Sequence, residues 1–307
     1  MGIDNNKHCL YYCLSEIFNI ETNYCIPECY IFHGLGGYGF KFFKYESFVP
    51  SYAIRGNTIN FDIFFKNTGV DVRRVEEQTK EDALNNTFSE LARKGYQLVL
   101  TNCYHLPYDT VNYRKNSDNH MIIIHEFDNI DNSFWVSDAI HKSKISKDDL
   151  IFARSKTLQS KFQYFSINTD AILSDDMLKE NIRSQVLLNA KKYISEDIKN
   201  MQNFRSELEN IDCCEGTIKK IACIGLSREL RGPHGTIMTR RLMSETCYHL
   251  SNQLEEEFKQ LEGMWLKLAN YLIRYSLNSG DITQLLAIYD QLLEMEFNLN
   301  YKLSQKI

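Results

Sequence analysis

The chain has little of what marks several classes of protein. Its 307 residues contain no run of about 18 apolar residues, the length needed to span a bilayer. The N-terminus carries Asp4 and lacks a long apolar core, so it does not resemble a signal peptide and we expect a cytoplasmic protein. Four prolines and fourteen glycines are too few for a disordered or linker-rich chain.

Charge and cysteine content exclude further classes. The formal net charge is −5 and no basic run is interleaved with aromatic residues, so we expect neither a nucleic-acid nor a membrane partner. The nine cysteines are odd in number and lie in a large chain, which argues against a disulfide framework. With 43% hydrophobic residues, the chain can build one large core or two ordinary ones.

The character of the sequence changes near residue 170. Helical and strand patterns alternate before this point, whereas residues 175–194, 215–230 and 237–303 contain almost no strand signal. We therefore predict an α+β domain at residues 1–168 and an all-helical domain at residues 169–307. The long amphipathic C-terminal helices can pair within one chain or between the subunits of a homo-oligomer.

A cysteine stands at the start of the first predicted helix. The helix is indicated by apolar residues at the spacing of one buried face: Leu10, Cys13, Leu14, Ile17 and Phe18. Unpaired N–H groups in the first turn carry partial positive charge, which favours a thiolate and lowers the pKa of Cys9. Cys9 is therefore a candidate nucleophile, and a buried structural cysteine is the alternative.

A histidine and an aspartate follow on two predicted strands. Residues 119–127 are apolar on both faces, as in the centre of a sheet, and a second strand is predicted at 134–137. Pairing of these strands brings His120 near Asp138, with His141 as a competitor if the register shifts. The order Cys, His, Asp is that of a papain-type thiol enzyme, in which the imidazole takes the thiol proton and the carboxylate orients the imidazole.

Two other patterns point to different sites. Residues 34–39 match G-x-G-x-x-G, but a dinucleotide site needs a strand before and a helix after, so a tight turn is favoured. Two thiol pairs with three intervening residues raise the alternative of a four-cysteine zinc-binding module; they are Cys9 with Cys13 and Cys25 with Cys29. Zinc sites more often use C-x-x-C knuckles, so the thiol-enzyme interpretation is favoured over the zinc module. That interpretation predicts no bound metal.

Several segments resemble the N-terminal domain of the butirosin-biosynthesis protein H family. They are His8-Cys9, residues 27–37, Leu106-Pro107-Tyr108, Asn119-His120, residues 136–138 and residues 147–154. The helical remainder, with Gly235 followed by Arg240-Arg241, is similar to the accessory domain that often follows. Members of this family have a papain-like cysteine peptidase fold and move an acyl group from a carrier-protein thioester to an amine in antibiotic assembly.

The resemblance implies a reaction and a set of partners. Cys9 would be the nucleophile, His120 the base and Asp138 the orienting group of an acyltransferase that forms amide bonds, as in polythioamide biosynthesis of the closthioamide type. The acyl group would arrive on a phosphopantetheinyl acyl or peptidyl carrier protein and leave on a small amine, with no cofactor. A cysteine peptidase or thioesterase is the alternative.

Further site residues are expected around this triad. Papain-like peptidases carry an oxyanion-hole glutamine shortly before the cysteine, where this chain has Ile3, so Asn5 or Asn6 would join the Cys9 N–H as donor. Candidate substrate-binding residues are Glu28, Gly36, Gly37, Tyr38 and Tyr108. An acidic carrier would dock on a basic patch, for which the candidates are Arg73-Arg74, Arg93-Lys94, Lys191-Lys192 and Arg240-Arg241.

Overall fold

The chain forms two compact units, each made of two separate stretches of sequence. The computed structural model describes residues 8–22, 25–45, 51–139, 141–158, 161–214, 216–277 and 279–306. The first unit comprises residues 1–28 and 69–172, and the second comprises residues 29–68 and 173–307. The chain passes from the first unit to the second for the last time between residues 172 and 173, close to the predicted domain boundary at 168/169. Residues 29–68, however, group with the C-terminal helices. The predicted division into domains stays a prediction.

The first unit is built on a six-stranded sheet with the order β3-β8-β4-β5-β6-β7 and antiparallel pairing throughout. The strands are β3 (Asp71–Glu76), β4 (Gln97–Asn102), β5 (Asn119–Asp128), β6 (Ser133–Ser137), β7 (Lys142–Ser146) and β8 (Gln163–Asn168). Every residue of β4 is buried, because strands flank it on both sides and helices cover the sheet. Strand β5 is also flanked by a strand on each side, which explains the continuous apolar character that predicted a central strand.

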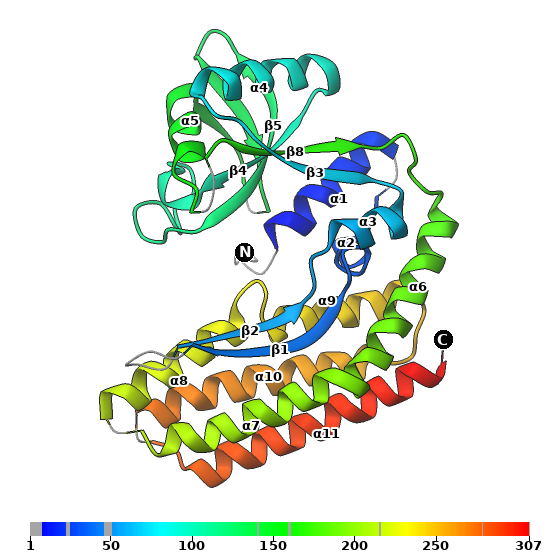
Figure 1. The fold of residues 1–307 in the computed structure, drawn as a ribbon, viewed down its shortest axis with the longest axis vertical. Coiled ribbons are helices and arrows are strands. Elements are labelled where there is room, and N and C mark those ends of the chain that lie inside the picture. Colours follow the sequence, from blue (N-terminus) through cyan, green and yellow to red (C-terminus); the bar gives the residue numbers. More distant parts are fainter. Residues whose placement is uncertain are drawn as a thin grey trace. The chain divides into compact units, whose positions relative to one another are not determined.

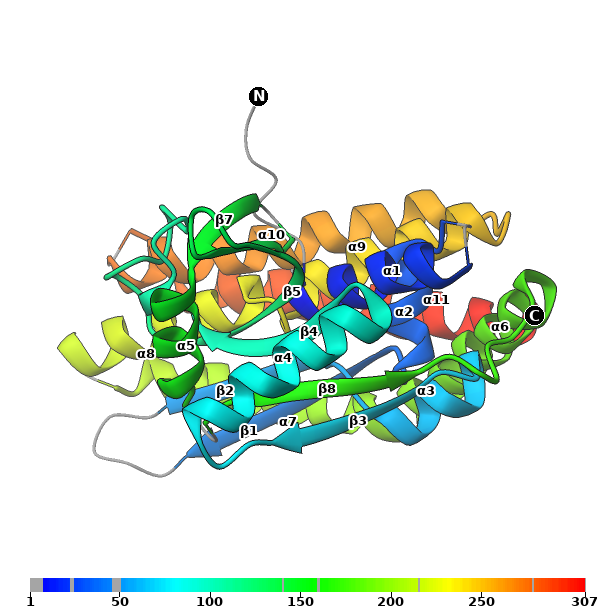
Figure 2. The ribbon, with the colours of Figure 1, turned by 90° about the horizontal axis from the view of Figure 1, so that it is seen from above.

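Helices cover both faces of this sheet. They are α1 (Cys9–Thr22), α4 (Lys80–Lys94), α5 (Lys147–Ser155) and a 3₁₀ turn, η1 (Cys103–His105). Helices α4 and α5 pack on β4 (Figure 2), whereas α1 packs on β5 from the other face (Figure 1). Local signals bound helix α4: the Thr79 side chain accepts a hydrogen bond from the Asp82 N–H at its start, and Gly95 ends it in a left-handed conformation.

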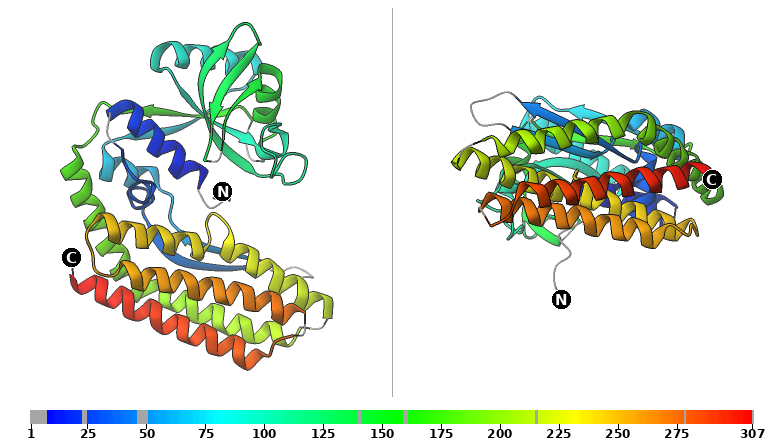
Figure 3. Two further views of the ribbon diagram at one scale, coloured as in Figure 1. Left: turned by 180° about the vertical axis from the view of Figure 1, so that it is seen from behind. Right: turned by 90° about the horizontal axis from the view of Figure 1, so that it is seen from below.

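The second unit combines a hairpin with a helical bundle. Its elements are α2 (Glu28–Gly34), β1 (Tyr38–Tyr45), β2 (Ser51–Asn57), α3 (Phe61–Thr68), α6 (Asp175–Lys192), the π-helical segment η2 (Tyr193–Asp197), α7 (Ile198–Asp212), α8 (Gly216–Arg231), α9 (Thr236–His249), α10 (Glu255–Ser276) and α11 (Ile282–Lys306). Helix α11 packs against α7 and α10 (Figure 3). The hairpin lies on α7 and α8, so the chain is an α+β protein with a helical C-terminal region.

A buried ion pair lies inside the bundle. Arg240 and Glu296 are fully buried, and the Arg240 Nε lies 2.7 Å from Oε1 of Glu296. The indole of Trp265 donates to the same carboxylate oxygen, and Nη2 of Arg240 lies 2.8 Å from the Tyr193 hydroxyl. The expectation that Arg240 belongs to an exposed docking patch is therefore wrong, because its side chain is buried and forms an ion pair with Glu296.

No helix in the described part of the chain is both long and apolar enough to cross a membrane.

Candidate active site

The start of α1 is shaped by the histidine before it. The ring Nδ1 of His8 accepts a hydrogen bond from the Leu10 N–H at 3.2 Å, and its carbonyl accepts from the Tyr12 N–H at 3.0 Å. The ring stacks on Tyr11 with 4.1 Å between centroids. His8 thus caps the helix and holds Cys9 at the first helical position, a role that the sequence pattern did not indicate.

The Cys9 thiol and the His120 ring are hydrogen-bonding neighbours. Burial raises the pKa of Cys9, but a hydrogen bond from His120, the charge of that ring, and the N–H groups of Met121 and Leu10 outweigh it, so the pKa is lowered. Burial lowers the pKa of His120, yet the hydrogen bonds to Asp138 and Cys9 raise it well above its usual range. These opposite shifts favour a thiolate–imidazolium pair.

The carboxylate of Asp138 holds the other nitrogen of the ring. The Nε2 of His120 lies 3.0 Å from Oδ2 of Asp138, which leaves Nδ1 to face the thiol. The Asp138 side chain is 1% exposed and that of His120 is 17% exposed. The structure therefore brings together the three residues predicted as a triad, in the order thiol, imidazole, carboxylate.

His141 acts on Asp138 through its backbone. Its N–H donates to Oδ1 of Asp138 at 2.7 Å, and its carbonyl accepts from the Asp138 N–H at 2.9 Å. The ring of His141 does not take the place of Asp138 beside His120. The alternative left open by the uncertain strand register is thus resolved in favour of Asp138, since both oxygens of this carboxylate are fixed.

The remaining histidine of β5 belongs to a different cluster. A register shift between Ile124 and Glu126 places His125 at a bulge, where its Nε2 lies 2.7 Å from Oγ of Ser137. Burial and the nearby Lys142 lower the pKa of His125. Burial also raises the pKa of Tyr12, which bonds the same serine, to about 12. His125 is therefore a neutral partner of Ser137 and no rival to His120.

Two predicted substrate contacts lie in the first unit. The Tyr108 ring meets the His141 ring edge to face at 5.8 Å, and burial together with the Asp138 carboxylate raises the pKa of its phenol well above the usual range. Glu28 lies in the first turn of α2. Burial raises the pKa of Cys13, and the negative charge of Glu28 raises it further. Tyr108 is thus beside the carboxylate, and Glu28 is near the thiol one turn beyond Cys9.

Three other predicted contacts lie in the second unit. Gly36 and Gly37 have φ angles of +120° and +72° and form the tight turn that the sequence predicted between α2 and β1. A strand follows this turn, so it differs from a dinucleotide-binding turn. Tyr38 is buried and its hydroxyl bonds the side chain of Asn300. Contact of these residues with substrate stays a prediction.

Other predictions fall outside the described residues or find no support. Asn5 and Asn6, the predicted oxyanion donors, lie outside the described residues. Within the described ranges, no three His, Cys, Asp or Glu side chains gather as metal ligands, so the four-cysteine zinc module has no site. Cys13 instead points its Sγ at the Met121 carbonyl, 3.7 Å away, and Cys25 is exposed.

Comparison with known proteins identifies the segment that carries this site. No curated protein matches the chain. Residues 8–139 match the family model described as butirosin biosynthesis protein H, N-terminal. The match begins one residue before Cys9 and ends one residue after Asp138, so it contains all three clustered residues. Over residues 8–139 the chain is therefore similar to the butirosin biosynthesis protein H N-terminal family, which supports the resemblance seen in the sequence.

Proposed function

We propose that the chain is a cysteine-dependent acyltransferase of antibiotic biosynthesis, which moves an acyl group from a carrier-protein thioester to an amine. The name of the matched family, which refers to butirosin biosynthesis, supports the antibiotic context. A papain-like fold of the catalytic region is part of this proposal. The antiparallel sheet with the Cys9 helix packed on β5 is consistent with it.

One observation carries the proposal. Cys9 lies at the N-terminus of α1 with a lowered pKa, and His120 lies between its thiol and the carboxylate of Asp138. An ordinary structural cysteine has no need of a charged histidine, and burial alone would have raised its pKa. The arrangement matches what a thiol nucleophile requires: a base that removes its proton and a third group that orients the base.

The first half of the reaction loads the enzyme. The Cys9 thiolate attacks the carbonyl carbon of the carrier thioester, the bond from that carbon to the carrier sulfur breaks, and the departing thiolate takes the proton held on His120. The oxyanion formed on the way would accept a hydrogen bond from the N–H of Cys9, one of the first four of α1, which lack an acceptor within the helix. Acyl-Cys9, a free carrier thiol and neutral His120 remain.

The second half releases the amide. A neutral amine attacks the acyl-Cys9 carbonyl and gives a proton to His120, after which the bond to Sγ breaks and the thiolate–imidazolium pair returns. One thioester is exchanged for another and then for a more stable amide, so no nucleotide is consumed. The sequence has no Walker loop to bind one.

Intact-protein mass spectrometry tests this proposal. A carrier protein loaded with an aromatic or aminoacyl group is mixed with the enzyme, with and without a diamine. We expect an acyl-enzyme mass that Cys9→Ala abolishes, and an amide product whose formation requires the amine. Cys13→Ala is the matched control, because its thiol is one helical turn away but buried with a raised pKa.

Two results would favour the alternatives. Release of free acid at the same rate with and without amine would make the protein a thioesterase or a peptidase. Absence of any acyl-enzyme, together with full activity of Cys9→Ala, would remove the covalent mechanism.

A further inference from the structure

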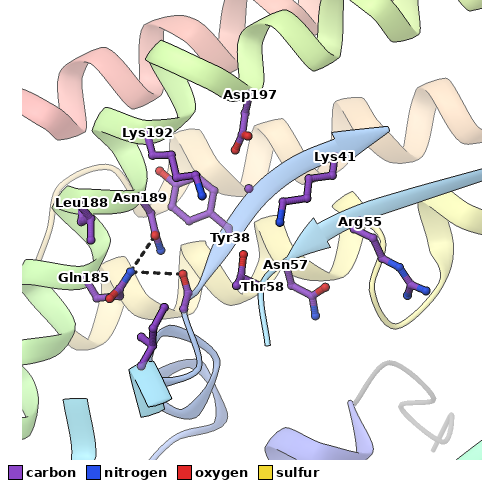
Figure 4. Close-up of a pocket in the computed structure, with 13 residues that line it drawn as sticks. Tyr38, Lys41, Arg55, Asn57, Thr58, Gln185, Leu188, Asn189, Lys192 and Asp197 are labelled. Carbon is purple, nitrogen blue, oxygen red and sulfur yellow. Dashed lines mark hydrogen bonds between the residues drawn. The ribbon is translucent and has the colours of Figure 1, made fainter. Parts of the chain in front are cut away.

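A small pocket in the second unit gathers positive charge beside the glycine turn. It is lined by the start of β1, by the end of β2 and by the junction of α6 with the π-helical segment η2, and has a volume of about 100 Å³ (Figure 4). Pockets for drug-sized ligands measure about 300–1,000 Å³, whereas a cavity that holds one water molecule needs only about 10–15 Å³. The pocket therefore fits one small chemical group.

The hairpin places two like charges directly opposite each other. Lys41 of β1 and Arg55 of β2 are cross-strand partners, and both side chains are exposed. Like charges at such positions destabilise a sheet. No carboxylate among the described residues forms an ion pair with either side chain. The arrangement is unfavourable for the protein alone and would be favourable around an anion.

A third cation reaches the same space from a helix. Figure 4 shows the amino groups of Lys192 and Lys41 and the carboxylate of Asp197 turned toward one another across the pocket. Lys192 is the last residue of α6, and Asp197 is the last residue of η2. Segments of π-helix are often found at functional sites. Three cations against one carboxylate leave a net charge of +2 among the described lining residues.

The one carboxylate among the described lining residues is already engaged. Asp197 is buried and accepts a hydrogen bond from the Phe40 N–H at 3.0 Å. Its contact with Lys192 is not a close ion pair, since the nearest acidic partner of Lys192 is Glu196 at 3.9 Å. Lys41, Arg55 and Lys192 thus keep most of their hydrogen-bonding capacity for a ligand.

A buried amide donor without a partner lies in the wall of the same pocket. Gln185 donates to Oδ1 of Asn189 at 2.9 Å and to the Gly36 carbonyl, and these bonds fix the orientation of the Asn189 amide (Figure 4). Asn189 is 6% exposed and its Nδ2 has no acceptor among the described residues. Nδ2 lies against Gly37, where any side chain would collide with it.

We propose that this pocket binds a phosphate group, held by Lys41, Arg55 and Lys192. A phosphate monoester carries a charge of about −1.5 to −2 at neutral pH, which matches the excess positive charge of the pocket. It also offers several acceptor oxygens for ammonium and guanidinium donors. The inference rests on the second unit alone and does not depend on the proposed acyl transfer.

Calorimetric titration of the full chain tests the site with inorganic phosphate, glycerol 3-phosphate and glycerol. We expect both phosphates to bind and glycerol not to bind. Tighter binding of the ester assigns the pocket to the phosphate end of a larger molecule, and equal or weaker binding assigns it to free phosphate. Lys41→Gln and Arg55→Gln should each weaken binding about tenfold.

Lys66→Gln is the matched control, because Lys66 is an exposed lysine of α3 in the same unit that does not line the pocket. Its phosphate affinity should equal that of the wild type. Without phosphate, Lys41→Gln should raise the thermal midpoint, since it removes a like-charge pair. Asn189→Asp keeps the shape of the side chain and should abolish binding. Absence of phosphate binding in the wild type, or equal weakening in Lys66→Gln, would overturn the proposal.

Discussion

Two buried pairs of opposite charge, one in each unit, differ in what surrounds them. Arg240 and Glu296 are fully buried, and their other hydrogen bonds go to packed side chains such as Trp265. His120 and Asp138 are also hydrogen bonded, but the His120 ring has the Cys9 thiol as its second partner and is partly exposed. A charge pair enclosed by packing contributes to structure, whereas a pair that includes an accessible nucleophile is arranged for chemistry.

Removal of the imidazole should have the largest effect. His120→Ala takes away the base that accepts the thiol proton and the charge that stabilises the thiolate. We expect acylation of Cys9 to fall by about 10⁶, the loss seen when the base of a serine-type triad is removed. Single-turnover acylation by a loaded carrier measures it, and His125→Ala on the same strand is the control that should stay active.

Asp138→Asn should come next. The amide cannot accept the same charged hydrogen bond from Nε2 of His120, so the ring loses its orientation and its raised pKa. Turnover should fall by about 10⁴ while the variant stays folded. Circular dichroism checks the fold, and wild-type turnover in this variant would show that Asp138 does not orient the ring.

In the second unit the same kind of change should act on stability. Arg240→Met leaves the Glu296 carboxylate buried without its cation, which should lower the free energy of unfolding by about 3–5 kcal/mol. The double variant Arg240→Met/Glu296→Leu should recover most of this loss, because it removes both charges. Denaturant unfolding followed by circular dichroism measures both. A loss below about 1 kcal/mol would contradict the structural role of the pair.

The pH dependence of Cys9 should give the smallest effect. Its pKa is lowered, so the thiolate persists at neutral pH, and labelling should slow only as the pH falls through that lowered value. Acylation should also decline at high pH, where His120 loses its proton above its raised pKa. At pH 7 we expect iodoacetamide to label Cys9 about tenfold faster than the exposed Cys25 and Cys213. His120→Ala should remove this difference.

Elements with strong local signals were predicted well from the sequence. Helix α1 begins at Cys9, as predicted, because its apolar residues repeat at the spacing of one buried helix face. Strand β2 was not predicted, and its side chains depend on distant residues: Tyr52 bonds Glu207, which lies 155 positions away. Likewise, the pattern that marked Arg240 as a surface residue held no sign of Glu296. The spacing and composition of residues along the sequence do not indicate long-range partners of this kind.

By itself, the sequence determined that Cys9 begins a helix, that His120 enters a buried strand and that a helical region follows, since caps and apolar periodicity act over a few residues. Tertiary structure decided the rest. It decided that Asp138, rather than His141, holds the His120 ring, because that choice depends on the register and the bulge of two paired strands. It also grouped residues 29–68 with the distant C-terminal helices, because the hairpin buries its side chains only where another part of the chain offers a complementary surface.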